Sequence, residues 1–235
     1  MDRMSERSYL VAGCRSWNRE VFDRQIRGLP GDWVFVDRPD ALTPRSVGGL
    51  DPRYLFFLHW STKVPHEITD RYECVNFHMT DVPFGRGGSP LQNLIARGHT
   101  STMLTALRMT DELDAGPVYM KRRLSLDGRA EEIYVRATSL AAEMIEAIIR
   151  DEPEPRPQEG EVVVFERRRP RQSEVAGTGS LDELHDFIRM LDADGYPRAY
   201  LVHRGYRYEF SNSARHGDHL EARVVVTRDE PRDTR

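Results

Sequence analysis

The spacing of hydrophobic positions changes repeatedly along the chain and predicts alternating strands and helices. Continuous apolar runs with the length of buried parallel strands occur at 8–14, 33–36, 54–59 and 73–78. Apolar residues that recur every three or four positions predict helices, most clearly over 130–150, and Asn18 is expected to cap a helix that begins near Arg19. Strands followed repeatedly by helices indicate a Rossmann-like, doubly wound α/β fold with a mostly parallel sheet.

The pattern changes after residue 150. The charged, proline-rich stretch 151–157 suits neither helix nor strand, and it predicts a boundary between a domain at 1–150 and a small α+β subdomain at 151–235. In the second part, Ser180 and Glu183 form a capping box that predicts a helix over 180–190. Alternating runs at 199–203, 206–210 and 220–227 predict antiparallel strands, which could pair across a two-fold axis and give a homodimer.

Composition narrows the classes of protein that the chain can belong to. A hydrophobic fraction of 39% supports a packed core. A net charge of −4 does not indicate an overall basic surface that would bind nucleic acid. Cys14 and Cys74 lie in apolar runs and are expected to be buried, reduced thiols. The histidines and cysteines lack metal-ligand spacing, so we expect no metal. The chain shows neither a signal peptide nor an apolar run of about 20 residues, so we expect a soluble, cytoplasmic protein.

Polar residues with possible chemistry follow the strand at 73–78. Period-two alternation places Asn76 and His78 on one face of that strand. The glycine-rich segment 82–88 has little propensity for regular structure and is expected to be a loop. Asp114 lies in a turn sequence, Leu-Asp-Ala-Gly-Pro, after a later strand. Because open α/β sheets hold ligands at such an edge, these three side chains could converge there.

The three side chains have complementary chemistry. A neutral imidazole accepts a proton near pH 7, a carboxylate orients the ring, and an amide N–H can hold a carbonyl oxygen as negative charge develops on it. These residue types fit direct acyl transfer to an amine without a protein nucleophile. Spacing alone leaves the alternative open that Asn76 and His78 are an ordinary hydrogen-bonded strand end and Asp114 part of a simple turn.

Three motifs in order resemble those of the folate-dependent formyltransferases of the methionyl-tRNA formyltransferase-like type. They are Asn76-x-His78, then Pro83-x-x-Arg86-Gly87 with Pro90 and Gln92, then Leu113-Asp114-Ala115-Gly116-Pro117. The resemblance covers about residues 8–150, which it identifies as the formyltransferase catalytic domain. Segments 17–18, 84–90 and 188–193 most resemble the sugar-nucleotide N-formyltransferases of the UDP-4-amino-4,6-dideoxy-sugar, pseudaminic-acid-like type.

The resemblance implies roles for residues of this sequence. His78 would be the general base or proton shuttle, Asn76 would stabilise the oxyanion of a tetrahedral intermediate, and Asp114 would orient His78 and help to receive the proton. The co-substrate N10-formyltetrahydrofolate would contact residues of three segments: Trp60, Thr62, Lys63, Val64, Arg86, Gly87, Met109, Thr110, Asp111 and Leu113.

The acceptor implied is the primary amine of a nucleotide-linked amino sugar. The tRNA-formylating members carry a further C-terminal domain for which the chain looks too short, so no nucleic-acid partner is expected. Alternatives are a non-sugar amine or hydroxylamine of a natural product, hydrolysis by water, or a formyltetrahydrofolate-binding module without transfer activity. The basic segment 167–171 could hold a diphosphate or be a solvated loop, and the C-terminal aromatic residues could stack a base or simply pack.

Overall fold

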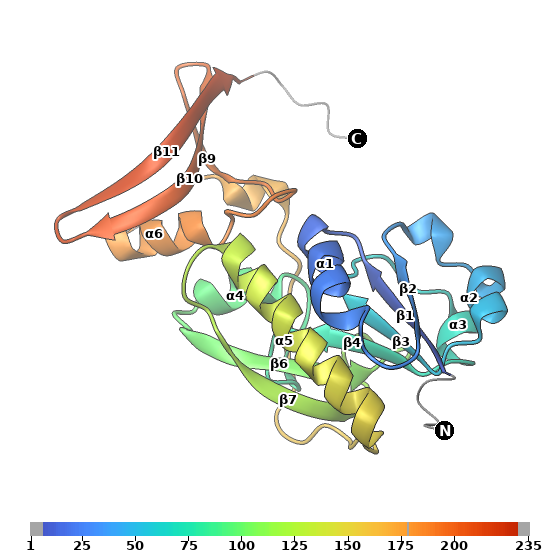
Figure 1. Cartoon of the computed structure of the whole chain (residues 1–235). Coiled ribbons are helices and arrows are strands. Elements are labelled where there is room, and N and C mark those ends of the chain that lie inside the picture. The colour runs from blue at the N-terminus through green and yellow to red at the C-terminus, as the bar shows by residue number, and fades with distance from the viewer. Residues whose placement is uncertain (1–6, 178, 230–235) are drawn as a thin grey trace. The chain divides into compact units, whose positions relative to one another are not determined.

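A six-stranded sheet forms the centre of the fold, and the computed structural model describes residues 7–177 and 179–229 (Figure 1). The strand order is β2-β1-β3-β4-β6-β7. The first four strands in this order are parallel neighbours, whereas β4 and β6 are antiparallel. The predicted mostly parallel α/β sheet is therefore confirmed. Its strands are β1 (Ser8–Gly13), β2 (Asp32–Val36), β3 (Tyr54–Leu58), β4 (Cys74–His78), β6 (Ser101–Arg108) and β7 (Val118–Ser125).

Helices cover both faces of this sheet. On one face, α2 (Pro44–Leu50) and α3 (His66–Thr69) place Val47 and Ile68 in a buried cluster with Leu55 and Phe57 of β3. On the other face, α5 (Ala130–Asp151) meets the sheet at a small cavity of about 10 Å³, which is lined by Leu58, His59, Phe77, Leu104, Ala137, Thr138 and Ala141. The 3.6-residue period of α5 therefore matches its packing.

The first helix differs from the expectation. Helix α1 (Ser16–Val21) begins earlier than predicted and continues as a π-helical turn, Phe22–Ile26. Asn18 lies inside α1 and does not cap it from outside, and its side-chain oxygen accepts from the backbone N–H of Arg15 at 3.1 Å. Because β1 ends at Gly13, Cys14 is exposed, and the prediction that it is buried is wrong; Cys74 is buried as predicted. Burial raises the pKa of the Cys74 thiol to about 12.

The segment expected to be a loop at 82–88 contains a short strand. Strand β5 (Phe84–Gly87) pairs in parallel with β8 (Val163–Phe165). Gly85 and Gly87 have φ of 78° and 100°, and a Cβ at Gly87 would lie 2.5 Å from the carbonyl oxygen of Phe165. The glycines that suggest a loop are therefore required by the close approach of β8. Helix α4 (Pro90–Ile95) follows.

The chain divides into two compact units. One contains the described residues within Met1–Pro90, Thr102–Leu124 and Val135–Phe165, and the other those within Leu91–Ser101, Ser125–Tyr134 and Glu166–Arg235. The domains at 1–150 and 151–235 remain a prediction. The second unit contains α6 (Leu181–Arg189), a 3₁₀ turn (Pro170–Ser173) and an antiparallel sheet of order β11-β10-β9, with strands at Ala199–His203 (β9), Tyr206–His216 (β10) and His219–Arg228 (β11).

Local signals in the second unit agree with the structure. The Ser180 side chain accepts from the backbone N–H of Glu183 at 3.1 Å, which confirms the predicted capping box. Arg204 and Gly205 have φ of 50° and 77°, as a tight turn between β9 and β10 requires. Among the helices that the structure describes, none combines the length and apolar character needed to cross a bilayer.

A buried polar contact ties α1, the end of β3 and α5 together. The Asn18 amide nitrogen lies 3.3 Å from His59 Nδ1 and 3.2 Å from Thr138 Oγ1. A neutral ring that accepts at Nδ1 satisfies this contact. Burial, reinforced by the positive charge of Arg15, lowers the pKa of His59 to about 4. His59 is therefore neutral at physiological pH in the folded chain.

This difference in pKa makes stability depend on pH. Below pH about 6.5 the unfolded chain takes up a proton at His59, and the folded chain does so only near pH 4, so stability falls as pH drops through this window. Because the ring remains partly accessible, we expect the free energy of unfolding to fall by about 1–3 kcal/mol relative to a His59→Gln variant. Denaturant titrations between pH 7 and pH 4 measure this difference, and parallel curves for the two proteins would contradict it.

Candidate active site

Strand β4 presents Asn76 and His78 on one face. The register pairs Asn76 with Phe57, whose side chain belongs to the buried cluster on that face. Phe77 points to the opposite face, where its ring lies 6.3 Å from that of Phe56. His78 is 6% exposed. The alternation of the sequence therefore gives two polar side chains at the carboxyl end of a central strand.

Asp114 is held in a constrained turn after β6. Its φ is 54°, a left-handed conformation that side chains rarely adopt. Two residues later, a Cβ at Gly116 would lie 1.8 Å from the carbonyl oxygen of Arg108, so only glycine fits there. The side-chain amide of Gln158 donates to the carbonyl oxygens of Asp114 and Gly116, both at 2.8 Å. The close approach at Gly116 and the two hydrogen bonds from Gln158 therefore both hold the turn in place.

The structure brings Asn76, His78 and Asp114 together. Asp114 Oδ1 accepts a hydrogen bond from Asn76 Nδ2 at 3.2 Å, and Oδ2 accepts one from the backbone N–H of Gly87 at 3.0 Å. Oδ2 also lies 3.5 Å from His78 Nδ1. The buried carboxylate is therefore the point at which β4, β5 and the turn after β6 meet. One Asn76 amide hydrogen donates to Asp114, which leaves the second for another acceptor.

The second nitrogen of His78 faces a carbonyl group. Nε2 lies 2.8 Å from the carbonyl oxygen of Gly85, which can only accept, so Nε2 carries a proton. Thr80 Oγ1 donates to the same carbonyl at 3.2 Å. Because Nε2 already carries a proton, the contact between Nδ1 and Asp114 Oδ2 is favourable only when a second proton lies between these two atoms. The pair is therefore arranged to hold and release one proton.

Sequence reasoning missed the residues that position this site. Arg86, predicted to contact the folate, donates from Nε to Gln158 Oε1 at 3.1 Å and from Nη1 to Glu112 Oε1 at 3.2 Å. Gln158 directly follows the proline-rich stretch 151–157 that looks like a linker, and no periodicity or motif singles it out. Gly87, also predicted to bind folate, contacts Asp114 through its backbone.

The other residues expected to contact the formyl donor, N10-formyltetrahydrofolate, fall into two groups, one packed against the buried cluster and one exposed. Trp60 and Met109 pack against the buried cluster that contains Val64. Trp60 Nε1 is buried and has no hydrogen-bond partner in the described part of the chain. The remaining residues are exposed: Thr62, Lys63, Thr110, Asp111 and Leu113. An apolar wall with a buried, unused N–H donor fits a heteroaromatic ligand that offers an acceptor.

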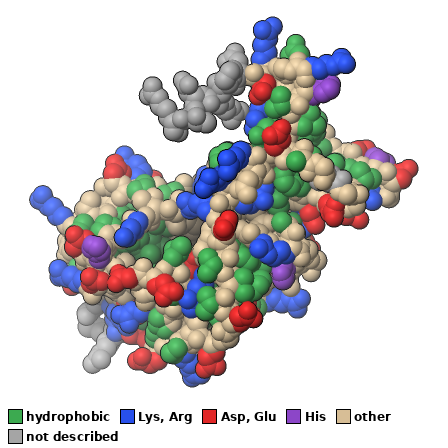
Figure 2. All heavy atoms as spheres, turned by 180° about the vertical axis from the view of Figure 1, so that it is seen from behind, with side chains coloured by type: hydrophobic (Ala, Val, Ile, Leu, Met, Phe, Trp, Pro, Cys, Tyr) green, Lys and Arg blue, Asp and Glu red, His purple; other side chains and the backbone are tan. Residues whose placement is uncertain are grey.

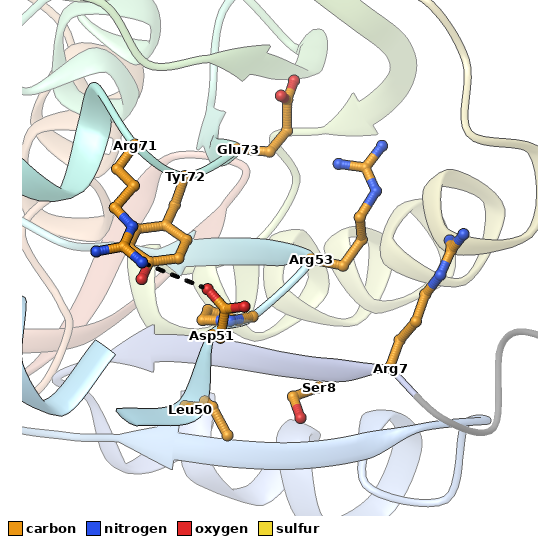
Figure 3. A pocket seen from close by; sticks show the side chains of 9 residues that line it. Arg7, Ser8, Leu50, Asp51, Arg53, Arg71, Tyr72 and Glu73 are labelled. Atoms are coloured by element: carbon orange, nitrogen blue, oxygen red, sulfur yellow. Dashed lines mark ion pairs between the residues drawn. The ribbon is translucent and has the colours of Figure 1, made fainter. Parts of the chain in front are cut away.

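A larger cavity lies elsewhere in the fold. It has a volume of about 620 Å³ and is lined by the residues that precede β1, β3 and β4, among them Arg53, Arg71, Tyr72 and Glu73 (Figure 3). It lies at the amino ends of the strands, whereas Asn76 and His78 lie towards the carboxyl end of β4. Ligand sites of open α/β sheets lie at the carboxyl ends. The polar triad, and not this cavity, is therefore the candidate active site.

Comparisons with known proteins agree with the motifs. A family model described as the C-terminal domain of methionyl-tRNA formyltransferase matches residues 170–227. The expectation that the chain has no counterpart of that domain is therefore wrong. A methionyl-tRNA formyltransferase of Bacillus thuringiensis (strain Al Hakam) is 27% identical over 169 residues, which are 68% of this chain and 53% of the relative. The chain spans about half the length of the curated relatives it matches.

Solved structures extend the similarity over most of the chain. A structure described as methionyl-tRNA formyltransferase from Clostridium thermocellum is 40% identical, with a TM-score of 0.91, and the match covers 94% of this chain and 99% of that one. The chain therefore belongs to the folate-dependent formyltransferase family. A sugar N-formyltransferase from a Shewanella species shares the fold at 13% identity, with a TM-score of 0.66 and coverage of 90% and 99%.

The two hydrogen bonds of Gln158 give a test of the turn. Gln158→Ala leaves the carbonyl oxygens of Asp114 and Gly116 without this donor, and we expect the free energy of unfolding to fall by about 1–3 kcal/mol. Glu159→Ala, an exposed neighbour, is the matched control and should change stability by less than about 0.5 kcal/mol. Urea denaturation measures both, and equal stability of the two variants would contradict the role assigned to Gln158.

Proposed function

We propose that the protein transfers the formyl group of N10-formyltetrahydrofolate directly to the primary amine of an acceptor. The observation that carries this proposal is the contact of Asn76 and His78 with one buried carboxylate, Asp114. Membership in the formyltransferase family supports the donor. The arrangement offers an oxygen-holding amide and a proton-accepting pair, which are the groups that acyl transfer to an amine needs.

Each residue of the triad has a separate task in this proposal. The free N–H of Asn76 holds the formyl oxygen while negative charge develops on it, which is worth roughly 3 kcal/mol in comparable sites. The attacking nitrogen gives up a proton, which His78 relays between its ring and Asp114. Asp114 keeps the ring oriented and shares the proton, which passes to N10 of tetrahydrofolate as the bond between N10 and the formyl carbon breaks. The 3.5 Å separation between His78 and Asp114 is of the kind that shortens when substrate binds.

The donor side is proposed to lie along Trp60, Val64 and Met109. The buried indole N–H of Trp60 would donate to a ring heteroatom, and the apolar cluster behind it would contact the pterin face. Backbone groups of the loop 109–113 would complete the pocket. When bound, the folate supplies an activated formyl group with a good nitrogen leaving group, and the protein supplies position and proton transfer.

Two acceptor classes follow from different observations. The motifs at 17–18, 84–90 and 188–193 favour a nucleotide-linked amino sugar. A net charge of −4, with Lys and Arg interspersed among Asp and Glu on the face shown in Figure 2, also favours a small acceptor. The 40% identical relative and the matched C-terminal domain favour a methionyl-tRNA amine. Both acceptors present a primary amine, so the triad chemistry is the same.

A formyl-transfer assay tests the proposal and separates the acceptors. Purified protein is incubated with N10-formyltetrahydrofolate and, in parallel, UDP- or dTDP-linked 4-amino sugars or charged methionyl-tRNA. We expect one acceptor to gain the mass of a formyl group, and a His78→Asn variant to lose at least about 100-fold in rate. Release of formate without an amine would identify a hydrolase, and binding of folate without transfer to any amine would contradict the proposal.

The buried indole N–H gives a separate test of the donor pocket. Trp60→Phe removes this donor, and we expect the Kd for tetrahydrofolate to rise about fivefold to tenfold. Trp33→Phe is the matched control, because Trp33 Nε1 donates to the carbonyl oxygen of Leu29 at 3.2 Å on the sheet edge β2. The control should lose stability without losing folate affinity. Calorimetric titration measures both constants, and unchanged affinity in Trp60→Phe would contradict this placement.

A further inference from the structure

Arg86 of β5 carries its positive charge in a place with little access to water. Its side chain is 14% exposed, whereas the side chain of its ion-pair partner Glu112 is 76% exposed. A guanidinium group that loses water requires hydrogen-bond acceptors in its surroundings. Nε donates to Gln158 Oε1 at 3.1 Å, and Nη1 donates to Glu112 Oε1 at 3.2 Å. Arg86 therefore connects β5 with two other segments of the chain.

The two contacts of Arg86 differ in strength. An ion pair with an exposed partner such as Glu112 contributes little, because water screens the charges and both side chains lose rotamer freedom. The contact with Gln158 is part-buried, and a hydrogen bond from a charged donor is stronger than one between neutral groups. Gln158 is therefore the partner through which Arg86 can act on its surroundings.

The side-chain amide of Gln158 is held by contacts on both of its atoms. Its oxygen accepts from Arg86, and its nitrogen donates to the carbonyl oxygens of Asp114 and Gly116. An amide carries its acceptor and its two donors on different atoms, so a group that fixes the oxygen also fixes the direction of the NH₂ group. Arg86 therefore keeps the donors of Gln158 turned towards the backbone of the Asp114 turn.

The backbone on either side of Gln158 is anchored independently of this contact. Arg156 and Val118, the first residue of β7, exchange two backbone hydrogen bonds with N–O distances of 2.7 and 2.9 Å. Val163, the first residue of β8, donates its N–H to the carbonyl oxygen of Pro83 at 3.1 Å. Loss of the guanidinium would thus release the direction of one amide and leave the course of the chain unchanged.

We propose that Arg86 is a positioning residue for the proton relay between His78 and Asp114, an inference that rests on the proposed formyl transfer. Gly87 donates its backbone N–H to Asp114 Oδ2 at 3.0 Å. Arg86, the preceding residue, acts through Gln158 on the backbone carbonyl of Asp114. Two adjacent residues of β5 therefore control both the place of the turn and the direction of its carboxylate.

The alternative role for Arg86 is direct contact with the folate. Nη2 has no hydrogen-bond partner within residues 7–177 and 179–229, so an oxygen of a ligand could accept from it. The two roles predict different kinetics. Loss of a folate ligand raises the Kd for tetrahydrofolate and adds to the effect of losing Gln158. Loss of a positioning residue lowers kcat, leaves the Kd unchanged, and has no further effect once Gln158 is absent.

A double-variant cycle separates these roles. We expect Arg86→Met and Gln158→Leu each to lower kcat about tenfold, because small displacements of a catalytic group are costly. The double variant should equal the slower single one, with the Kd for tetrahydrofolate unchanged. Arg207→Met is the matched control, since Arg207 is 13% exposed, lies on β10 and pairs with Glu209 at 2.8 Å, and it should keep its kcat. Additive losses, or a loss confined to the Kd, would overturn the proposal.

A measurement without substrate distinguishes a failure of this inference from a failure of the proposed function. The NMR signals of the Asn76 side-chain amide and the His78 ring report their contacts with Asp114. Both single variants should shift these signals in the same direction, and the control should leave them in place. Circular dichroism confirms that each variant is folded. A wild type that formylates no amine contradicts the proposed function, whereas unshifted signals in both variants would overturn the positioning role.

Discussion

The carboxylate of Asp114 is the constraint on which the candidate site depends. A buried carboxylate is costly unless hydrogen bonds replace the water it loses. Here the side chain of Asn76 donates to Oδ1 and the backbone N–H of Gly87 donates to Oδ2, and the His78 ring also faces Oδ2. Three segments distant in sequence are therefore oriented by one group, and each of them is needed to satisfy it.

The surrounding fold supplies the rigidity that this contact requires. The left-handed turn at Asp114 persists because Gly116 allows close approach to the backbone of β6 and because Gln158 holds two of its carbonyl groups. Strained backbone of this type is found where a side chain must be aimed accurately. On the other side, the carbonyl of Gly85 orients the His78 ring. The site is therefore organised before any substrate arrives, which is how enzymes lower the cost of reaching the transition state.

The sequence predicts the strands of the site better than its contacts. Alternation places Asn76 and His78 on one face, because side-chain direction in a strand depends only on local geometry. The meeting with Asp114 follows from the pairing of β4 with β6, which is non-local and which the motifs suggest only through resemblance. The role of Gln158 could not be predicted, since a single amide in a polar loop carries no periodic signal. The glycines of β5 predict a loop, whereas in the structure they allow close packing against β8.

The carboxylate of Asp114 offers the most direct test of the proposed chemistry. Asp114→Asn keeps the size of the side chain but replaces an accepting oxygen with an NH₂ group, so it cannot accept from both Asn76 and Gly87 and also present an oxygen to the His78 ring. We expect the rate of formyl transfer to fall at least about 100-fold with unchanged affinity for tetrahydrofolate. Asp70→Asn, an exposed carboxylate at the end of α3 with no part in the proposed site, should keep its rate. Wild-type formyl transfer by Asp114→Asn would contradict the central claim.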